Sequence, residues 1–291
     1  MRAAPALITV AIPVRDAEEH IADQLGALAT QTYRGAWELV VADNGCTDGT
    51  LSRVWDFRDR LPAVRVADAT AQKGLNHARN VATAYARGDF LCFCDADDVA
   101  SPGWLQAMAA ASRHADVVAG ALEFDALNDP VARALYHWDP PSGLVEAHGF
   151  LAYVPGGNCG VWTRIARELR WDESFVFGSS DIEFSWRAQL ASCRLHFTPE
   201  AVMHQRFTRD LGGLARQFYA YGKSDAALYR RFRECGMPRP DGCEAYDTWQ
   251  ALFAHRRDLA GPREARANWV RTAARKWGRV VGSVRHRALV L

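Results

Sequence analysis

The sequence predicts an α/β fold in which helices flank a mainly parallel sheet, followed by a helical C-terminal extension. Short apolar segments alternate with segments of helical periodicity through the first half of the chain, which favours parallel strands with crossover helices. From residue 211 onward helical spacing dominates. Of the 291 residues, 49% are hydrophobic and 24% are charged, which is enough apolar material for a large core and excludes wholesale disorder.

Six apolar runs are predicted strands, at residues 7–14, 37–42, 64–66, 90–94, 117–121 and 201–203. The first helix is expected after Asp16, because Glu19 follows three residues later as in a capping box and Ile21, Leu25 and Leu28 recur at helical spacing. A further helix is expected over 74–87, ended by Gly88. This order gives an α/β domain over residues 1–205.

The second half has two parts. Residues 125–160 are rich in Pro, Gly, Asp, His and aromatic residues without clear periodicity, and a long irregular segment in a compact domain is usually functional. Residues 206–291 form the predicted extension, with helices over 211–234 and 246–259, a Pro/Gly break at 236–242, and a basic tail.

Charge is unevenly distributed along the chain. The net charge is only +1, so the composition does not indicate a nucleic-acid partner, yet residues 262–291 hold eight Lys or Arg against one Glu. A basic helix with tryptophans can lie on an anionic membrane, but packing of its apolar stripe on the α/β domain is slightly favoured. With no signal peptide and no membrane-spanning run, we expect a cytoplasmic protein, with possible peripheral contact at the inner face of the membrane.

Carboxylates gather where three predicted strands end. Asp16 and Asp43 follow the first two strands, and the apolar run FLCFC leads directly into Asp95-Ala96-Asp97-Asp98. Ligands of open parallel sheets bind beyond these strand ends. Caps and turns suffice to explain Asp16, but three acids within four residues exceed what a turn needs. An Asp-x-Asp pair suits Mg²⁺ or Mn²⁺ shared with phosphate oxygens, which implies a nucleoside diphosphate compound.

Three segments in order carry a family resemblance: VAIPVRDAEEHI, VVADNGCTDGT and KGLNHARNVATAYARGDFLCFCDADD. Together they resemble the family 2 glycosyltransferases, whose catalytic domain has the GT-A fold, over roughly residues 7–205. The resemblance implies a metal-assisted, inverting transfer of a sugar from a nucleoside-diphosphate sugar (UDP, dTDP or GDP type) to an acceptor hydroxyl.

The resemblance assigns a donor side. It places the nucleotide base against Pro13, Val14 and Arg15 and against Asp43, which is followed by Asn44 where many members have a second acid. It further assigns nucleotide contacts to Lys73, Gly74, Arg79, Asp95 and Ala96, and a metal to Asp97 and His204.

The resemblance also assigns an acceptor side. The family's Glu-Asp segment is matched by Ser180-Asp181, so Asp181 is the expected catalytic base, favoured over Glu183. A helix N-terminus at this point would keep the Asp181 carboxylate ionised, as a base requires. Contacts to the acceptor or the leaving diphosphate are expected from Gly157, Asn158, Trp186, Arg187 and Arg206.

The acceptor stays open as a saccharide, a natural product or a lipid-linked compound, with aromatic residues of 125–155 (Tyr136, His137, Trp138, Tyr153) as candidate contacts. Two other functions remain: a degenerate sugar-nucleotide-binding or scaffold protein, kept open by Asn44 and Ser180, and a nucleotidyltransferase. A dehydrogenase is excluded, because no GxGxxG follows the first strand.

Overall fold

The computed structural model describes residues 2–136, 138–175, 178–240 and 248–290. His137 therefore lies outside the described residues, as do residues 241–247 at the predicted start of the second C-terminal helix.

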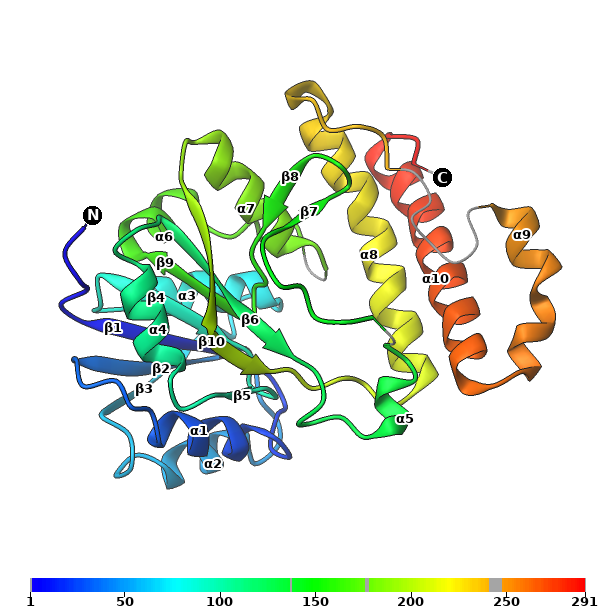
Figure 1. Cartoon of the computed structure of the whole chain (residues 1–291). Helices are drawn as coiled ribbons and strands as arrows, with labels where there is room; N and C mark the ends of the chain where they lie inside the picture. Colours follow the sequence, from blue (N-terminus) through cyan, green and yellow to red (C-terminus); the bar gives the residue numbers. More distant parts are fainter. Residues whose placement is uncertain (1, 137, 176–177, 241–247, 291) are drawn as a thin grey trace.

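The α/β domain is built on one sheet in the order β3-β2-β1-β4-β9-β6-β10-β5 (Figure 1). The strands are β1 (Ile8–Val14), β2 (Trp37–Asp43), β3 (Ala63–Asp68), β4 (Phe90–Cys94), β5 (Val99–Ala100), β6 (Val117–Glu123), β9 (Asn158–Trp162) and β10 (Leu195–His204). β1 pairs in parallel with β2 and β4, and β6 with β10, whereas β9 runs antiparallel to both β4 and β6. The predicted α/β fold is confirmed.

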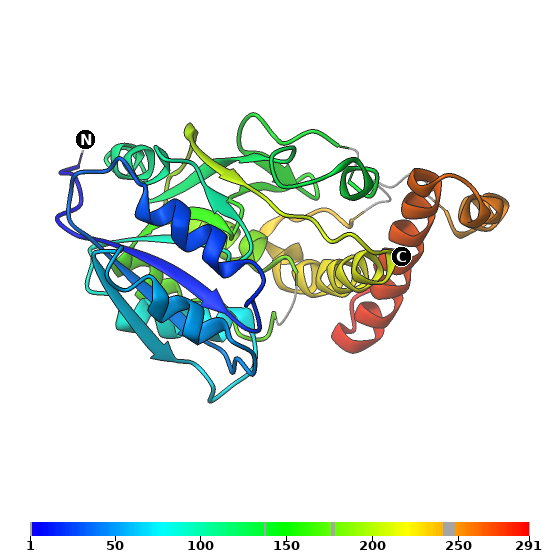
Figure 2. The same cartoon turned by 90° about the horizontal axis from the view of Figure 1, so that it is seen from below.

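Helices cover both faces of this sheet (Figures 1 and 2). One apolar core packs α1 (Ile21–Ala29), α2 (Thr50–Asp56) and α4 (Trp104–Ala111) on one face. The other packs α3 (Leu75–Tyr85), α6 (Thr163–Leu169) and α7 (Ser180–Leu190) on the opposite face. β1, β2 and β4 are buried almost throughout, which explains why their sequences read as continuous apolar runs.

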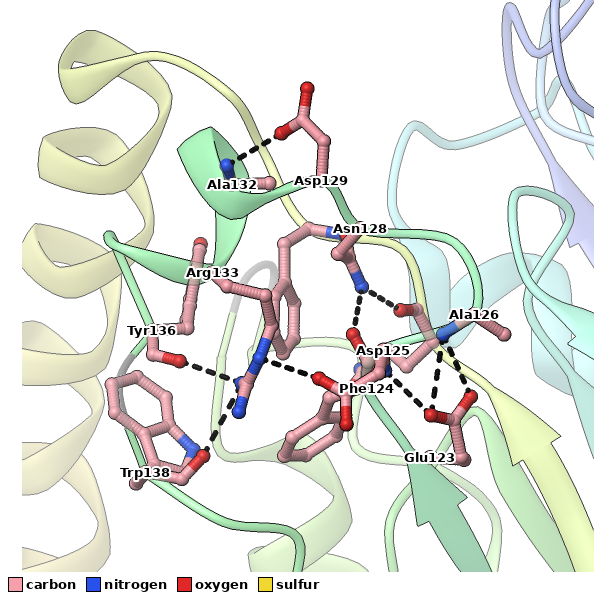
Figure 3. A network of polar contacts seen from close by, with 12 residues as sticks. Glu123, Phe124, Asp125, Ala126, Asn128, Asp129, Ala132, Arg133, Tyr136 and Trp138 are labelled. Carbon is pink, nitrogen blue, oxygen red and sulfur yellow. Dashed lines mark hydrogen bonds and ion pairs between the residues drawn. The ribbon is translucent and has the colours of Figure 1, made fainter.

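The irregular segment after β6 folds into α5 (Pro130–Arg133) and a small antiparallel pair, β7 (Val145–Ala147) and β8 (Leu151–Tyr153). Polar contacts hold its first turn, as Figure 3 shows. Glu123 accepts hydrogen bonds from the backbone of Asp125 and Ala126, and Asp129 caps α5 through the N–H of Ala132. The predicted lack of periodicity thus reflects turns stabilised by side chains.

The C-terminal extension is a pair of long helices, α8 (Leu211–Phe232) and α10 (Arg263–His286), with the shorter α9 (Trp249–Ala254) beside α10 (Figure 1). Short 3-10 turns follow α8 at Arg233–Cys235 and α9 at Arg256–Ala260. Glycines allow the close contact of α8 with α10: a Cβ on Gly222 would lie 2.0 Å from the carbonyl oxygen of Arg275, and one on Gly278 2.2 Å from that of Tyr219. The domain boundary at residues 205/206 stays a prediction.

A buried carboxylate joins the two long helices. Asp225 of α8 is fully buried and lies 3.0 Å from Nε of Arg275 and 2.8 Å from Nε of Arg279, both on α10. His148, in the turn between β7 and β8, places Nε2 3.3 Å from the same carboxylate. Part of the basic tail is therefore turned inward, and α10 packs on α8. None of the described helices is both long enough and apolar enough to span a membrane.

Candidate active site

The predicted donor residues meet where β1, β2 and β4 end. The parallel register sets Val14 beside Asp43, and Asp95 follows β4, which pairs with β1 on its other side. The Asp43 carboxylate accepts hydrogen bonds from the backbone of Gly45 and Cys46, at 3.0 and 2.8 Å. Arg15 lies beyond β1 and is 3.7 Å from the carboxylate of Asp16. Asp43 thus shapes the turn that closes this end of the sheet.

Asn44 is buried and holds the loop that carries Lys73 and Gly74. Its Nδ2 donates to the carbonyl oxygens of Ala69 and Gln72, at 2.6 and 2.8 Å, and its Oδ1 accepts from the N–H of Gly74 at 2.8 Å. A carboxylate could not donate the first two bonds. These hydrogen bonds explain why the chain has asparagine and not aspartate at this position. Lys73, which precedes Gly74 in the same loop, is exposed.

Arg79 is a buried cation linking the donor side to the start of α7. Its Nη2 lies 3.7 Å from Oδ1 of Asp95, its Nη1 donates to Oγ of Ser180 at 3.4 Å, and its guanidinium lies over the ring of Trp171 at 4.4 Å. In the described part of the chain its Nε has no hydrogen-bond partner. A charge this deeply buried requires nearby carboxylates, and Asp95 is one of them.

The glycines before β9 lie against these side chains. A Cβ on Gly156 would be 2.7 Å from Nη2 of Arg79, and one on Gly157 would be 2.3 Å from Oδ2 of Asp95. A side chain on either glycine would therefore have to displace Arg79 or Asp95. The side chain of Asn158, by contrast, is occupied within the sheet, where it bonds the carbonyls of Ala121 and Ala201 and the indole of Trp104.

Three carboxylates crowd the loop after β4. Burial and the charges of Asp95 and Asp97 raise the pKa of Asp98, whose Oδ1 accepts from the N–H of Arg206 at 2.9 Å. Asp97 is exposed at the surface, yet desolvation by the surrounding loop and the charge of Asp95 raise the pKa of Asp97. Arg206 also donates to the carbonyl of Asp97 and reaches Asp23 at 3.1 Å. The crowding favours occupation by a cation.

The donor set fits a divalent metal that takes most ligands from its substrate. No three His, Cys, Asp or Glu side chains cluster as a metal site among the residues described. Mg²⁺ bound beside a phosphate usually takes one or two protein carboxylates, with phosphate and water oxygens as its other ligands. His204 bonds through Nδ1 to Oε2 of Glu123 at 2.6 Å. A histidine that donates from Nδ1 to a carboxylate keeps its Nε2 lone pair for a ligand.

Asp181 lies in the first turn of α7, where its carboxylate accepts from the N–H of Ile182 at 2.9 Å and from that of Gly156 at 3.4 Å. Burial raises the pKa of Asp181, and the charge of Arg79 opposes that rise. Glu183, the alternative base, is fully buried and bonded to Arg187 and Arg231, at 2.5 and 3.1 Å. Its ion pairs leave Asp181 as the better candidate.

Two predicted residues of α7 anchor the helix. Trp186 is fully buried and its Nε1 donates to the carbonyl of Leu151 at 2.8 Å. Arg187 bonds Glu183 and the carbonyls of Leu169 and Arg170. The structure therefore does not bring their side chains together with Asp181.

The sequence analysis missed Tyr221. Burial and the negative charges of Asp181 and Asp95 raise the pKa of Tyr221, on α8, to about 12, and its ring packs on Gly178 in the turn that leads into α7. Tyr153, a predicted acceptor contact, has a pKa raised to about 12 by burial and the charge of Asp181. Tyr136 and Trp138 instead join an aromatic cluster with Phe207 and Phe218. No local pattern links residues 40 positions apart, so only the fold reveals Tyr221.

Solved structures share this architecture. The chain aligns with a mannosyltransferase, PcManGT of Pyrobaculum calidifontis, solved with GDP-Man and Mn²⁺, at a TM-score of 0.65 and 18% identity over 96% of this chain and 87% of that one. It aligns with S. aureus TarS 1–349, solved with UDP, at a TM-score of 0.57 and 19% identity over 99% and 92%. The fold is that of the GT-A transferases.

The family model described as glycosyl transferase family 2 matches residues 9–158. The chain belongs to glycosyl transferase family 2. AglE of Haloferax volcanii is 24% identical over 76% of this chain and 74% of its own length. WfgD of Escherichia coli, a β-1,3-glucosyltransferase that uses UDP-Glc, is 34% identical over 32% of this chain, and the match spans only 36% of WfgD.

Proposed function

We propose that this protein is an inverting glycosyltransferase that moves a sugar from a nucleoside-diphosphate sugar to an acceptor hydroxyl, with Asp181 as the general base. One observation carries the proposal. Arg79 contacts Asp95 on the donor side and Ser180, the residue before Asp181, so one buried cation lies between the donor carboxylate and the start of the helix that carries the base. Family membership and the ends of β1, β2 and β4 support the same site.

Each group has a role in the displacement. Asp181 takes the proton of the acceptor hydroxyl as its oxygen attacks the anomeric carbon, and one displacement inverts that carbon. Arg206 and Lys73 lie on the donor side, where cations stabilise the departing diphosphate. Asp97 and Nε2 of His204 are the proposed holders of Mn²⁺ or Mg²⁺, which would supply charge neutralisation at the diphosphate. Pro13, Val14, Arg15, Asp43, Gly74 and Ala96 are the proposed surroundings of the nucleotide.

The donor nucleotide is proposed to be of the UDP, dTDP or GDP type. The acceptor is a hydroxyl of a saccharide, a natural product or a lipid-linked compound. PcManGT was solved with GDP-Man and Mn²⁺ and TarS with UDP, which supports the nucleoside-diphosphate class.

A lipid surface is a further proposed partner, in a cytoplasmic protein that contacts the membrane peripherally. Trp277 and Val284 of α10 are 57% and 78% exposed, and their spacing of seven places them on one face of the helix. Arg285 and Arg287 beside them are exposed. Exposed aromatic, aliphatic and basic side chains together suit an anionic bilayer.

The test is a thermal-shift panel of UDP, GDP, dTDP, CDP and ADP, with and without Mn²⁺, on the wild type and on Asp97→Asn. A nucleotide at 100 times its Kd stabilises the folded state by about 2.7 kcal/mol. We expect one nucleotide to raise the unfolding temperature only with Mn²⁺, and the substitution to remove that rise. If no nucleotide shifts the wild type, the proposed function is wrong.

A further inference from the structure

Two tyrosines from outside α7 lie beside the segments that hold the proposed base: the ring of Tyr221 packs on Gly178, and the N–H of Val154, next to Tyr153, donates to Oγ of Ser185 on α7 at 3.1 Å. Tyr153 belongs to β8 and Tyr221 to α8, and the negative charge of Asp181 raises the pKa of both tyrosines in addition to burial. The groups whose charges interact with that of Asp181 include Arg79 from α3, Tyr153 from β8, Cys159 from β9 and Tyr221 from α8. Both phenols stay protonated at neutral pH and are hydrogen-bond donors.

The ring of Tyr221 is fixed against the turn that leads into α7. A Cβ on Gly178 would lie 2.5 Å from Cδ1 of Tyr221, so the ring packs directly on the glycine backbone, which has a φ of 76°. One turn further along α8, Oγ of Ser224 donates to the carbonyl oxygen of Gly178 at 3.1 Å. α8 is thereby fixed beside the segment that positions Asp181.

A hydrogen-bond chain sets the direction of the Tyr221 hydroxyl. The hydroxyl of Tyr136, whose backbone lies in the network of Figure 3, donates to Oε1 of Gln217 at 2.5 Å. Nε2 of Gln217 then donates to the Tyr221 oxygen at 3.0 Å. Because the amide oxygen accepts from Tyr136, the amide nitrogen faces Tyr221. The Tyr221 oxygen therefore accepts this bond, and its own hydrogen is available for another partner.

We infer that Tyr221 donates its hydroxyl hydrogen to the acceptor oxygen while Asp181 accepts the hydrogen of that same oxygen, so that α8 completes the acceptor site. This inference rests on the proposed function. Two opposed hydrogen bonds orient one lone pair of the acceptor oxygen for attack. The group recognised is a neutral hydroxyl, which both donates and accepts. An amine acceptor protonated at neutral pH would have no lone pair for Tyr221.

The step balances without any redox partner. The acceptor O–H bond breaks and its proton goes to Asp181, and the oxygen lone pair forms the new bond to the anomeric carbon. The bond from that carbon to the diphosphate oxygen breaks, and its electron pair leaves with the nucleoside diphosphate. Tyr221 keeps its hydrogen throughout and acts only by hydrogen bonding.

The test measures nucleoside diphosphate release from UDP-glucose, UDP-GlcNAc and GDP-mannose with Mn²⁺, using water and added glycerol as hydroxyl acceptors. Tyr221→Phe should lower kcat about tenfold, the value of one hydrogen bond of about 1.4 kcal/mol, and leave the donor KM unchanged. Gln217→Glu should lower kcat similarly, because a carboxylate would accept the Tyr221 hydrogen and turn it away. Tyr219→Phe, two residues away on α8, should leave kcat unchanged.

The possible outcomes separate a failure of the inference about Tyr221 from a failure of the proposed function. Wild-type kcat in both Tyr221→Phe and Gln217→Glu overturns the inference. So does a wild type that binds nucleotide but releases none with either hydroxyl. Absence of any nucleotide binding instead contradicts the proposed function. Gln217→Glu keeps the Tyr221 ring, so it tests the hydrogen bond even if Tyr221→Phe disturbs the packing on Gly178.

Discussion

At the scale of single residues, the buried charge of Arg79 acts both on Asp95 of the donor side and on Asp181, the proposed base. Its guanidinium is buried against Trp171 and lies near Asp95 and Asp181. Loss of this one charge changes the environment of both carboxylates. The sequence resemblance assigns Arg79, 16 residues before Asp95, only to nucleotide binding. Its hydrogen bond to Ser180 becomes visible only in the folded structure.

Asp181 gives the first prediction. Asp181→Asn should lower turnover by a factor of about 10² to 10⁴, the usual contribution of a general base, and should preserve the thermal shift caused by nucleotide. Because burial raises the pKa of Asp181, wild-type kcat should fall with acidity at a pH above the value of about 3.9 typical of an exposed aspartate.

Arg79→Gln should shift the fall of kcat at acidic pH (the acid limb of the pH profile) to higher pH, because the charge that opposes protonation of Asp181 is removed. An unchanged limb, measured from kcat against pH, would contradict the electrostatic role of Arg79. Full turnover in Asp181→Asn would instead exclude Asp181 as the base.

Asn44 gives a second prediction. Asn44→Asp should lower the free energy of unfolding by about 1–3 kcal/mol, because a carboxylate would face the carbonyls of Ala69 and Gln72 without donating to them. Asn268→Asp is the matched control, since the Asn268 oxygen accepts from Arg271 and a carboxylate preserves that bond. Urea denaturation measures both. Equal midpoints for the two variants would show that the Asn44 bonds do not stabilise the loop.

At the scale of elements, the pairing of α8 with α10 depends on Asp225. Burial disfavours the Asp225 charge, but the ion pairs with Arg275 and His148 outweigh it and hold its pKa well below the usual range. For a carboxylate with a depressed folded-state pKa, the stabilisation is fully present above the unfolded value of about 3.9 and is lost as the pH falls through the folded value.

Asp225→Asn should lower the free energy of unfolding at neutral pH by about 3–5 kcal/mol, because it leaves the fully buried guanidinium of Arg279 without this counter-charge and removes the ion pair with the half-buried Arg275. The difference from the wild type should shrink as the pH is lowered below about 4, because the unfolded wild-type chain then takes up a proton at Asp225 while the folded chain keeps the carboxylate ionised. Chemical denaturation at pH 7 and pH 3 measures it. A pH-independent difference would mean that the carboxylate stabilises by packing alone.

At the scale of the whole molecule, the lipid-facing proposal for α10 predicts binding to anionic vesicles. The full chain should float with phosphatidylglycerol vesicles at moderate salt and less with phosphatidylcholine alone. Trp277→Ser with Val284→Ser should reduce flotation, since both side chains are mostly exposed and would supply the apolar contact with the bilayer. No flotation with the anionic vesicles would rule out the membrane contact.

The sequence predicted the parts of the fold that depend on local pattern. The strand predicted over 90–94 is β4, and the other apolar strands begin and end within about two residues of their predicted limits. The patterns of β1, β2 and β4 are the clearest, because both faces of these strands are buried. β10 is longer than the predicted 201–203, since its first half alternates exposed and buried residues and its register shifts between Thr198 and Val202. The antiparallel direction of β9 was not predicted, because strand direction depends on distant partners.

In the site, too, residues within local motifs could be predicted from the sequence, whereas contacts that depend on the fold could not. Asp95 and Asp181 were singled out from their motifs, and in the structure Arg79 contacts Asp95 and Ser180, the neighbour of Asp181. Tyr221 was missed because its contacts with Gly178 and Gln217 depend on how α8 packs. The helix predicted over 246–259 is shorter, ending as α9 at Ala254 before a 3-10 turn.

The ion pairs of Asp225 have a consequence for protein synthesis. Arg275 and Arg279 follow Asp225 by 50 and 54 residues, so α8 lacks its partner until α10 has left the ribosome. The sheet strands end at His204, and a nascent chain can therefore assemble the described sheet well before α8 is secured. We expect an arrested chain that stops before α10 to bind nucleotide and yet to transfer poorly, because Tyr221 would lack its fixed place beside Asp181.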